Sequence, residues 1–376
     1  MRRVEEYFPN REVKPVLTLE TSRGCWWGER AHCTFCGLNG LSMGYRAVKP
    51  QLAIELFNSL FQYSGKVSRL MAVDNILPKS YLQQVLPLLD TPSDMEIFYE
   101  VKADLSEQDM AVLAKSGVKQ IQPGIEALAT PTLKLMKKGI TVFQNLKLLK
   151  LCALYSVQPH WNLLVGFPGE GEKSYRSYVD MIPRLFHLYP PSGTFPVRFD
   201  RFSPYHDQAE KYGLDLLPLD FYSLIYPFDK EDLKQFAYYF ADHNLRAEYF
   251  LTMAKWIGKV RAKVIQWQAR WNNSTQLPSR LHFKGGSQTI YDSRSGSVVE
   301  YRIGEMGGAI LKHLIKPTLV DELLRVFPEG AVLSEIAQLQ EYGLLFQEDD
   351  RLFSLVLEDE HGSRASLPIA SCTAQS

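Results

Sequence analysis

Short apolar runs alternate with amphipathic stretches from about residue 15 to residue 202, and this alternation restricts the possible folds more than any other feature. The apolar runs have the length of strands, and the stretches between most of them carry helical spacing. Strands that alternate with helices form a parallel sheet, either open or closed into a barrel. The candidate strands are 16–20, 69–73, 96–101, 118–122, 161–165 and 197–200.

Three of the intervening stretches predict helices directly. Apolar residues recur at helical spacing over 52–61 and over 81–89. A third helix is expected around Met110–Leu113, with Ser106 as its N-cap.

The pattern changes after Pro204. The aromatic-rich stretch 231–271 predicts long helices, and 276–286 predicts a boundary. A hairpin is expected from 287–291 and 297–301, with a closing hairpin from 344–346 and 353–357. Between them lie three short helices, and Gly343 is expected to end the last of them. These helices are 307–314, 319–326 and 333–342.

The composition excludes several classes of protein. Lys and Arg together equal Asp and Glu together, at 42 each, so net charge gives no reason to expect a nucleic acid or an anionic membrane as partner. No apolar run is long enough to span a bilayer, and the N-terminus lacks the apolar core of a signal peptide. The expected compartment is the cytoplasm, where thiols stay reduced.

Three of the five cysteines fall within twelve residues. Cys25, Cys33 and Cys36 form a C-x7-C-x2-C pattern, and an odd total argues against a disulfide framework. Thiolates are the natural ligands of iron–sulfur clusters. Three of them leave one iron of a [4Fe–4S] cluster open to a chelating amino acid group. S-adenosylmethionine has such a group beside a sulfonium, and one electron cleaves it to a 5′-deoxyadenosyl radical.

Two other interpretations of the cysteines remain open. A zinc site could use His32 or a distant histidine as its fourth ligand, or the three cysteines could be unrelated and buried. The cluster is favoured because the loop directly follows the first strand and no second Cys/His pair follows at zinc-finger spacing. Cys152 and Cys372 are expected to be a core thiol and a tail residue.

Polar and turn-forming residues follow the carboxyl ends of the candidate strands, where active sites of parallel barrels lie. Glu100 and Lys102 alternate at the end of one strand, so both are expected to face one ligand, with a salt bridge at the rim as the alternative. Gly124 is expected to permit a close backbone approach. The segments are 20–25, 74–75, 100–102, 122–126 and 166–170.

A cysteine triad after the first strand, ending in Cys-x-Phe-Cys, resembles the radical S-adenosylmethionine superfamily. With seven residues between the first two cysteines, the segment resembles more specifically the cobalamin-dependent C-methyltransferases that mature ribosomally made peptides. The resemblance covers about residues 15–240. The matching segments are 22–29, 32–40, 73–76, 98–103, 121–126, 161–170 and 200–205.

The resemblance implies an α/β fold: a partial (β/α)6 TIM-type barrel, followed by a helical extension and a small winged-helix-like module. The expected parts are a lead-in at 1–14, the barrel at 15–230, the extension at 231–280, the module at 281–357 and a disordered tail at 358–376. It also implies that Cys25, Cys33 and Cys36 hold a [4Fe–4S] cluster.

The resemblance further implies which residues contact S-adenosylmethionine. Asp74 and Asn75 lie where the superfamily binds the methionine ammonium, and Gly166-Phe167 resembles the turn that contacts adenine. Glu100 would accept from the ribose hydroxyls, and Lys102 would meet the carboxylate. The full expected set is Phe35, Asp74, Asn75, Glu100, Lys102, Gln122, Gly124, Glu126, Gly166 and Phe167.

One departure concerns cobalamin. Members of the family carry a cobalamin-binding domain before the barrel, whereas only twenty-four residues precede Cys25. Three explanations are open: the gene is split or truncated, cobalamin arrives on a separate chain, or the protein does not use it.

The leading hypothesis is an enzyme that modifies a ribosomally made peptide, with C-methylation as the expected reaction. The alternatives are cobalamin-independent epimerisation or cross-linking, and a non-enzymatic module that binds zinc and a peptide. The expected partners are a precursor peptide, an electron donor protein and a separate cobalamin-binding chain, with no nucleic acid and no membrane. The C-terminal module would bind the peptide leader as an added strand, or be a structural cap. DNA binding is disfavoured because Lys312, Lys316 and Arg325 form only a thin basic set.

Overall fold

The computed structural model describes residues 15–358, apart from 41, 274–276, 286–287 and 328. The lead-in expected at 1–14 and the tail expected beyond residue 358 lie outside the described residues. Among the residues described, no helix is both long enough and apolar enough to cross a membrane.

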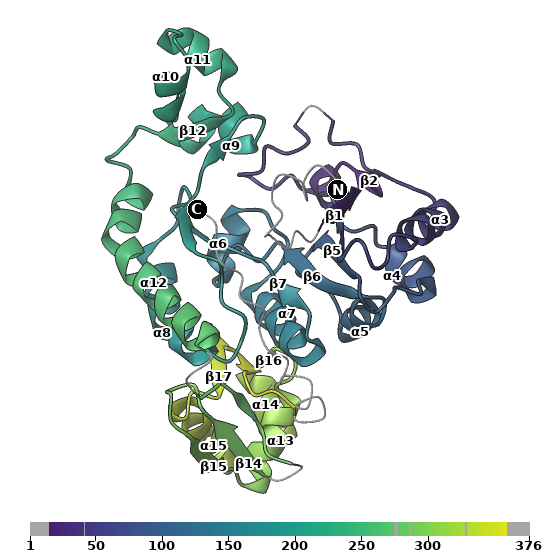
Figure 1. Ribbon diagram of the computed structural model, residues 1–376. Coiled ribbons are helices and arrows are strands. Elements are labelled where there is room, and N and C mark those ends of the chain that lie inside the picture. Colours follow the sequence, from purple (N-terminus) through teal and green to yellow (C-terminus); the bar gives the residue numbers. More distant parts are fainter. Residues whose placement is uncertain (1–14, 41, 274–276, 286–287, 328, 359–376) are drawn as a thin grey trace.

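A five-stranded parallel sheet forms the centre of the barrel (Figure 1). Its strand order is β1-β4-β5-β6-β7, so the strands of this sheet lie side by side in the order in which they follow one another along the chain. The strands are β1 (Val16–Leu19), β4 (Arg69–Ala72), β5 (Glu96–Val101), β6 (Val118–Pro123) and β7 (Gln158–Pro159). The first four confirm the expected strands to within one residue at each end.

Helices cover one side of this sheet, as Figure 1 shows for α3, α4, α5 and α7. In β5 the side chains of Ile97, Tyr99 and Val101 share one face and are all buried, and Phe98 on the other face is buried as well. The helices are α3 (Pro50–Phe61), α4 (Tyr81–Gln84), α5 (Glu107–Lys115), α6 (Thr130–Leu135) and α7 (Val142–Tyr155).

Two of the expected helices show how local sequence sets their ends. Ser106 caps α5 with a capping box, as expected, because its hydroxyl accepts from the backbone N–H of Asp109. The helix expected over 81–89 is shorter than predicted. It ends after Gln84, and η1 (Leu86–Leu88) continues it as a 3-10 turn. Pro87 lacks an N–H and restricts the residue before it, which breaks the α-helical ladder.

The strand expected over 161–165 is divided. Only Leu163–Val165 of this range is a strand, β8, and it pairs in parallel with β9 (Thr194–Pro196), while β7 takes the fifth place in the main sheet. The strand expected over 197–200 is likewise shorter and later, as β10 (Phe199–Asp200). The central sheet and the β8–β9 pair together give the partial TIM-type α/β barrel that the sequence predicts.

The extension differs from the expected pair of long helices. α11 (Lys230–Phe236) and α12 (Glu248–Asn272) are separated by β12 (Tyr239–Asp242), a strand that the sequence analysis missed. β12 pairs with β10 on one side and with β11 (Leu216–Pro218) on the other, and these two partners favour the extended backbone. Three short helices complete this region: α9 (Pro204–Asp207), η3 (Ala209–Tyr212) and α10 (Phe221–Ile225).

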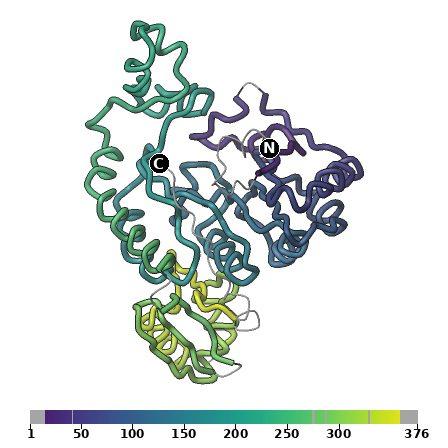
Figure 2. The backbone as a smooth tube through the Cα atoms, viewed as in Figure 1, coloured from purple at the N-terminus to yellow at the C-terminus, as the bar shows by residue number. Residues whose placement is uncertain are grey.

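The C-terminal module lies at the opposite end of the molecule from the first loop of the barrel (Figure 2). The expected hairpin is present as β14 (Thr289–Asp292) and β15 (Val299–Arg302), and the closing hairpin as β17 (Leu345–Glu348) and β18 (Arg351–Ser354). The expected boundary at 276–286 is wrong in part, since β13 (Leu281–Phe283) pairs with β14. The remaining elements are α13 (Glu305–His313), β16 (Thr318–Leu319), α14 (Val320–Val326) and α15 (Glu329–Glu341).

Candidate functional site

The loop after β1 carries all three cysteines of the motif. β2 (Ser22–Arg23) pairs with β3 (Arg46–Ala47) and closes the loop at its base. Cys25 caps the short helix α2 (Trp26–Arg30), and its sulfur accepts from the backbone N–H of Gly28 at 3.3 Å. The backbone N–H of Cys36 donates to the carbonyl of Cys33 at 3.2 Å, so these two cysteines share one tight turn.

Buried contacts from distant elements hold the second half of this loop. Thr34 is buried, and its N–H and hydroxyl donate to the carbonyls of Met136 and Leu135 at 3.1 and 2.9 Å. The N–H of Tyr205 donates to the carbonyl of Thr34 at 2.9 Å. Thr34, one of the two residues between Cys33 and Cys36, therefore ties the loop both to α6 and to the segment after β10.

Two glycines allow the loop to approach β10 and the residues after it. A Cβ added at Gly37 would lie 2.2 Å from the carbonyl oxygen of Arg201, and one added at Gly40 would lie 1.9 Å from the Cβ of Phe202. Real Cβ atoms do not approach so closely, so any larger residue would push the loop away from its support.

The three thiols are half-buried, and none forms a disulfide. Burial raises the pKa of Cys33, and burial together with Cys33 raises the pKa of Cys36 to about 12. Among the described residues, no three His, Cys, Asp or Glu side chains converge closely enough to hold a single metal ion. A cluster of several irons separates its thiolates more widely than one ion does, so the arrangement is compatible with a cluster.

A largely buried lysine that the sequence analysis missed lies beside this loop. Lys138 follows α6, and its ammonium is 3.4 Å from Glu126 and 5.7 Å from the centre of the Phe35 ring. Burial opposes its charge, but Glu126, Cys33 and Cys36 outweigh that effect and raise the pKa of Lys138. Its sequence context, Lys137-Lys138-Gly139, is that of a solvated turn, so no local signal distinguishes it.

Glu100 and Glu126 lie on the same side of the sheet as Lys138. Burial, Glu126 and Asp74 raise the pKa of Glu100 to about 7, while Lys138 opposes this rise. A Cβ at Gly124 would lie 2.6 Å from the ammonium of Lys138, so the glycine gives the cation room. Two carboxylates and one largely buried cation thus face one place at the ends of β5 and β6. Gln122, the β6 partner of Glu100, is exposed.

Asp74 is fully buried, and its carboxylate is directed into the start of the cysteine loop. It accepts from the N–H of Thr21 at 2.7 Å and from the hydroxyls of Thr21 and Ser22. These bonds occupy the carboxylate, so its geometry favours a supporting role over contact with an ammonium group. Asn75 donates to the side-chain oxygen of Asn39 at 2.9 Å, which ties the end of β4 to the same loop.

The turn at Gly166 and Phe167 follows β8, and Phe167 packs edge-on against Phe35 with ring centres 5.8 Å apart. Gly166 has a φ of +82°, a conformation that other residues rarely adopt. Buried Glu170 fixes the turn by accepting from the N–H of Gly166 at 2.7 Å and from the hydroxyl of Tyr175 at 2.7 Å. This support was not foreseen from the sequence.

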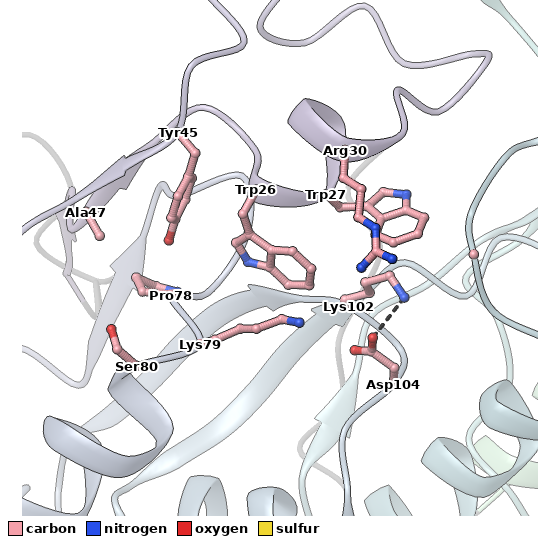
Figure 3. Close-up of a pocket in the computed structure, with 11 residues that line it drawn as sticks. Trp26, Trp27, Arg30, Tyr45, Ala47, Pro78, Lys79, Ser80, Lys102 and Asp104 are labelled. Carbon is pink, nitrogen blue, oxygen red and sulfur yellow. Dashed lines mark hydrogen bonds and ion pairs between the residues drawn. The ribbon is translucent and has the colours of Figure 1, made fainter.

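The alternation along the strand predicted that Lys102 lies beside Glu100. It does not, because β5 ends at Val101 and the strand pattern stops there. Its ammonium pairs with Asp104 at 2.9 Å and lies 4.5 Å from the centre of the Trp27 ring. Lys102 therefore forms a salt bridge, but with Asp104 and not with Glu100. Lys102 lines a separate cavity of about 630 Å³ between α2 and the loops after β4 and β5 (Figure 3).

Residues 19–182, a little under half of the chain, match the family model described as the radical SAM superfamily. No curated protein matches the chain.

Several solved structures resemble the chain at low identity. The radical S-adenosylmethionine methyltransferase TsrM from Kitasatospora setae is 19% identical over 55% of this chain and 40% of its own, with a TM-score of 0.43. The cobalamin-dependent radical enzyme OxsB is 18% identical over 52% of this chain and 29% of its own, with a TM-score of 0.37. Coproporphyrinogen III oxidase HemN from Escherichia coli is 12% identical over 94% of this chain and 89% of its own, with a TM-score of 0.39. The chain therefore spans less than half the length of TsrM and OxsB.

Proposed function

Residues 19–182 form a radical SAM domain, and from this premise we propose that the chain modifies a ribosomally synthesised peptide, most readily by C-methylation. The domain implies a [4Fe–4S] cluster and S-adenosylmethionine as cofactors. The observation that supports the proposal is the half-buried cysteine triad, which lies at the strand ends beside a largely buried cation and two carboxylates.

We assign the cluster to Cys25, Cys33 and Cys36. When bound, the cluster with its free iron supplies the reductive cleavage of S-adenosylmethionine. The chain contributes a loop fixed by Thr34, and the Phe35–Phe167 contact shields that loop from water on one side.

We assign the polar ends of S-adenosylmethionine to the group around Lys138. A largely buried ammonium is suited to a carboxylate, and the neighbouring Glu126 holds that ammonium in place at 3.4 Å. Glu100, with a pKa of about 7, can accept a hydrogen bond when ionised or donate one when protonated, so it suits hydroxyl groups. The exposed Gln122 and the turn at Gly166 complete the set of candidate contacts.

The reaction is tested on protein reconstituted under anaerobic, reducing conditions, which keep the thiols free. Incubation with S-adenosylmethionine and dithionite should release 5′-deoxyadenosine, which mass spectrometry detects. With a precursor peptide and methylcobalamin, the peptide should gain one methylene unit in mass. No release of the nucleoside would contradict the proposal at its base.

The same assay separates the two alternatives. Epimerisation or cross-linking would proceed without cobalamin, and it would leave the peptide's mass unchanged or lower by hydrogen. A zinc-binding module would give a colourless protein with one zinc on metal analysis and no nucleoside release.

The C-terminal module carries a feature that supports peptide binding. β15 is the outer strand of the β13-β14-β15 sheet, and Val298 and Val299 at its start are 49% and 39% exposed. An unpaired edge of this kind can accept a peptide as an added strand. We propose that the leader of the precursor binds there. Replacing both valines by Asp should weaken leader binding in calorimetry, whereas replacing both by Thr should not.

A further inference from the structure

The cavity between α2 and the loops after β4 and β5 has no role in the site described above. Its lining combines two tryptophans with three cationic side chains and one carboxylate: Trp26, Trp27, Arg30, Lys79, Lys102 and Asp104. The ammonium of Lys79 lies 4.1 Å from the centre of the Trp26 ring, and that of Lys102 lies 4.5 Å from the centre of the Trp27 ring. Figure 3 shows the Arg30 guanidinium directed toward Lys102 across the cavity.

Two of these cations lack an acidic partner within the described part of the chain. Lys102 is paired with Asp104, but Arg30 and Lys79 are exposed and make no ion pair there. The only carboxylate on α2, that of Glu29, accepts from the backbone N–H of Tyr45 at 2.6 Å. The face around the cavity therefore presents an unbalanced positive charge over an aromatic floor.

This face adjoins the cysteine loop through the two tryptophans. Trp26 directly follows Cys25, and its indole donates to the carbonyl of Leu77 at 3.1 Å. The indole N–H of Trp27 faces the carbonyl of Lys137 at 3.2 Å and also the Cys33 thiol. A Cβ at Gly139 would lie 2.1 Å from Trp27, so the ring is held against that glycine. One face of Trp27 thus lines the cavity, and its N–H edge meets the site.

We propose that this face docks an acidic one-electron donor protein. The inference rests on the proposed function, because reductive cleavage of one S-adenosylmethionine consumes one electron. A flavodoxin supplies it when its anionic flavin hydroquinone becomes the neutral semiquinone, with no proton released. The electron is consumed in breaking the carbon–sulfur bond, which yields methionine and the 5′-deoxyadenosyl radical.

Charge complementarity selects this occupant. Electron transfer weakens steeply with distance, so a donor must dock on a face close to the ligands, as this one is. Redox partners form small, transient interfaces whose association depends on opposite charges. The unpaired Arg30 and Lys79 would meet carboxylates around the flavin edge, while the indoles give the contact an apolar centre.

Binding is the primary test, and it does not require a loaded cluster. Two acidic probes, a flavodoxin and a [2Fe–2S] ferredoxin, are titrated onto the full chain by surface plasmon resonance at several salt concentrations. At least one should bind, and its association should slow as salt rises. The double variant R30E/K79E should bind at least about tenfold more weakly. The control K312E/K316E changes the charge equally, at the other end of the molecule, and should bind as the wild type does.

The second readout is 5′-deoxyadenosine release with two reductants. In R30E/K79E, release driven by the bound donor protein should fall, whereas release driven by dithionite should stay at the wild-type level. If the charge reversal misfolds the loop, as iron content and melting temperature would show, the neutral variant R30Q/K79Q replaces it with a smaller expected loss.

Three results would overturn the docking proposal: no binding of either probe, undiminished binding by R30E/K79E, or equal loss in the control. Failure of the proposed function looks different. In that case dithionite releases no 5′-deoxyadenosine from the wild type, while the binding measurement still decides whether the face docks an acidic donor.

Discussion

Two largely buried lysines at opposite ends of the barrel have pKa values that are shifted in opposite directions. Lys138, at the strand ends, has Glu126 and two cysteines beside it, and its pKa is raised. Lys150 on α7 faces the C-terminal module, donates to the carbonyl of Ser354 at 2.8 Å, and has a pKa lowered by burial to about 7. Burial acts the same way on both, so the neighbouring anions make the difference.

The neighbours of each lysine indicate what each end of the barrel does. At the C-terminal module, buried side chains meet backbone carbonyls. The ring of His187, whose pKa is lowered by burial, lies 2.9 Å from the carbonyl of Leu355, and Arg294, which also pairs with Asp292, donates to the carbonyl of Gly343 at 2.9 Å. That end is a structural joint. At the cysteine loop, by contrast, charged side chains lie beside one another, and such a cluster is typical of a binding site.

The largest expected effect comes from the cysteines. Replacing Cys33 by Ala should remove a cluster ligand and lower 5′-deoxyadenosine release by more than the roughly 10–100-fold that even supporting residues of metal sites produce. Replacing the buried Cys152 on α7 by Ala should leave iron content and release unchanged. Iron analysis measures the iron content of each variant, and mass spectrometry measures its 5′-deoxyadenosine release. Equal losses in the two variants would contradict the different roles assigned to the two ends of the barrel.

The two lysines give the next effect. K138M should weaken S-adenosylmethionine binding by about 10–100-fold, because a charge-assisted hydrogen bond contributes about 1.5–3 kcal/mol. K138R, which keeps the positive charge, should lose less affinity than K138M. K150M should leave binding unchanged, and calorimetry with each reconstituted variant provides the comparison. A loss in K150M as large as that in K138M would contradict the assignment.

The pH dependence of stability should also separate the two lysines. Lys150 has a folded pKa of about 7, below its unfolded value, so between these values the unfolded state binds more protons. The free energy of unfolding should therefore rise with pH from about 7 to about 10, by at most about 1.4 kcal/mol per unit from this group. Lys138, with its raised pKa, adds stability that is lost only above its unfolded value.

Denaturant unfolding across this pH range tests the prediction. The wild type and K138M should share the slope, and K150M should flatten it. Parallel slopes in the wild type and K150M would show that Lys150 keeps its charge in the folded state.

The smallest expected effect concerns glycines. Gly37→Ala places a Cβ 2.2 Å from the carbonyl of Arg201 and should destabilise the cysteine loop by about 1–3 kcal/mol, with reduced iron content. Gly258 on α12 has no neighbour within 4 Å of an added Cβ, so Gly258→Ala should stabilise the protein by about 0.5–1 kcal/mol. Melting temperature and iron content distinguish the two.

Sequence patterns predicted the elements whose signals are local. The strands at 16–20, 69–73, 96–101 and 118–122 have the alternation and length that define them, and Ser106 has the capping chemistry that starts α5. The missed strand β12 lies in an aromatic-rich segment with no such local pattern, and it exists because β10 and β11 flank it.

The sequence by itself determined the parallel α/β barrel and the position of the cysteine triad on its first loop. Both follow from spacing along the chain, which residue types express directly. Only the tertiary structure decided that Lys138 faces the triad while Lys102 turns to a separate cavity, and that the carboxylate of Asp74 supports the loop. These outcomes depend on which distant side chains share a low-dielectric space, and no spacing along the sequence encodes that.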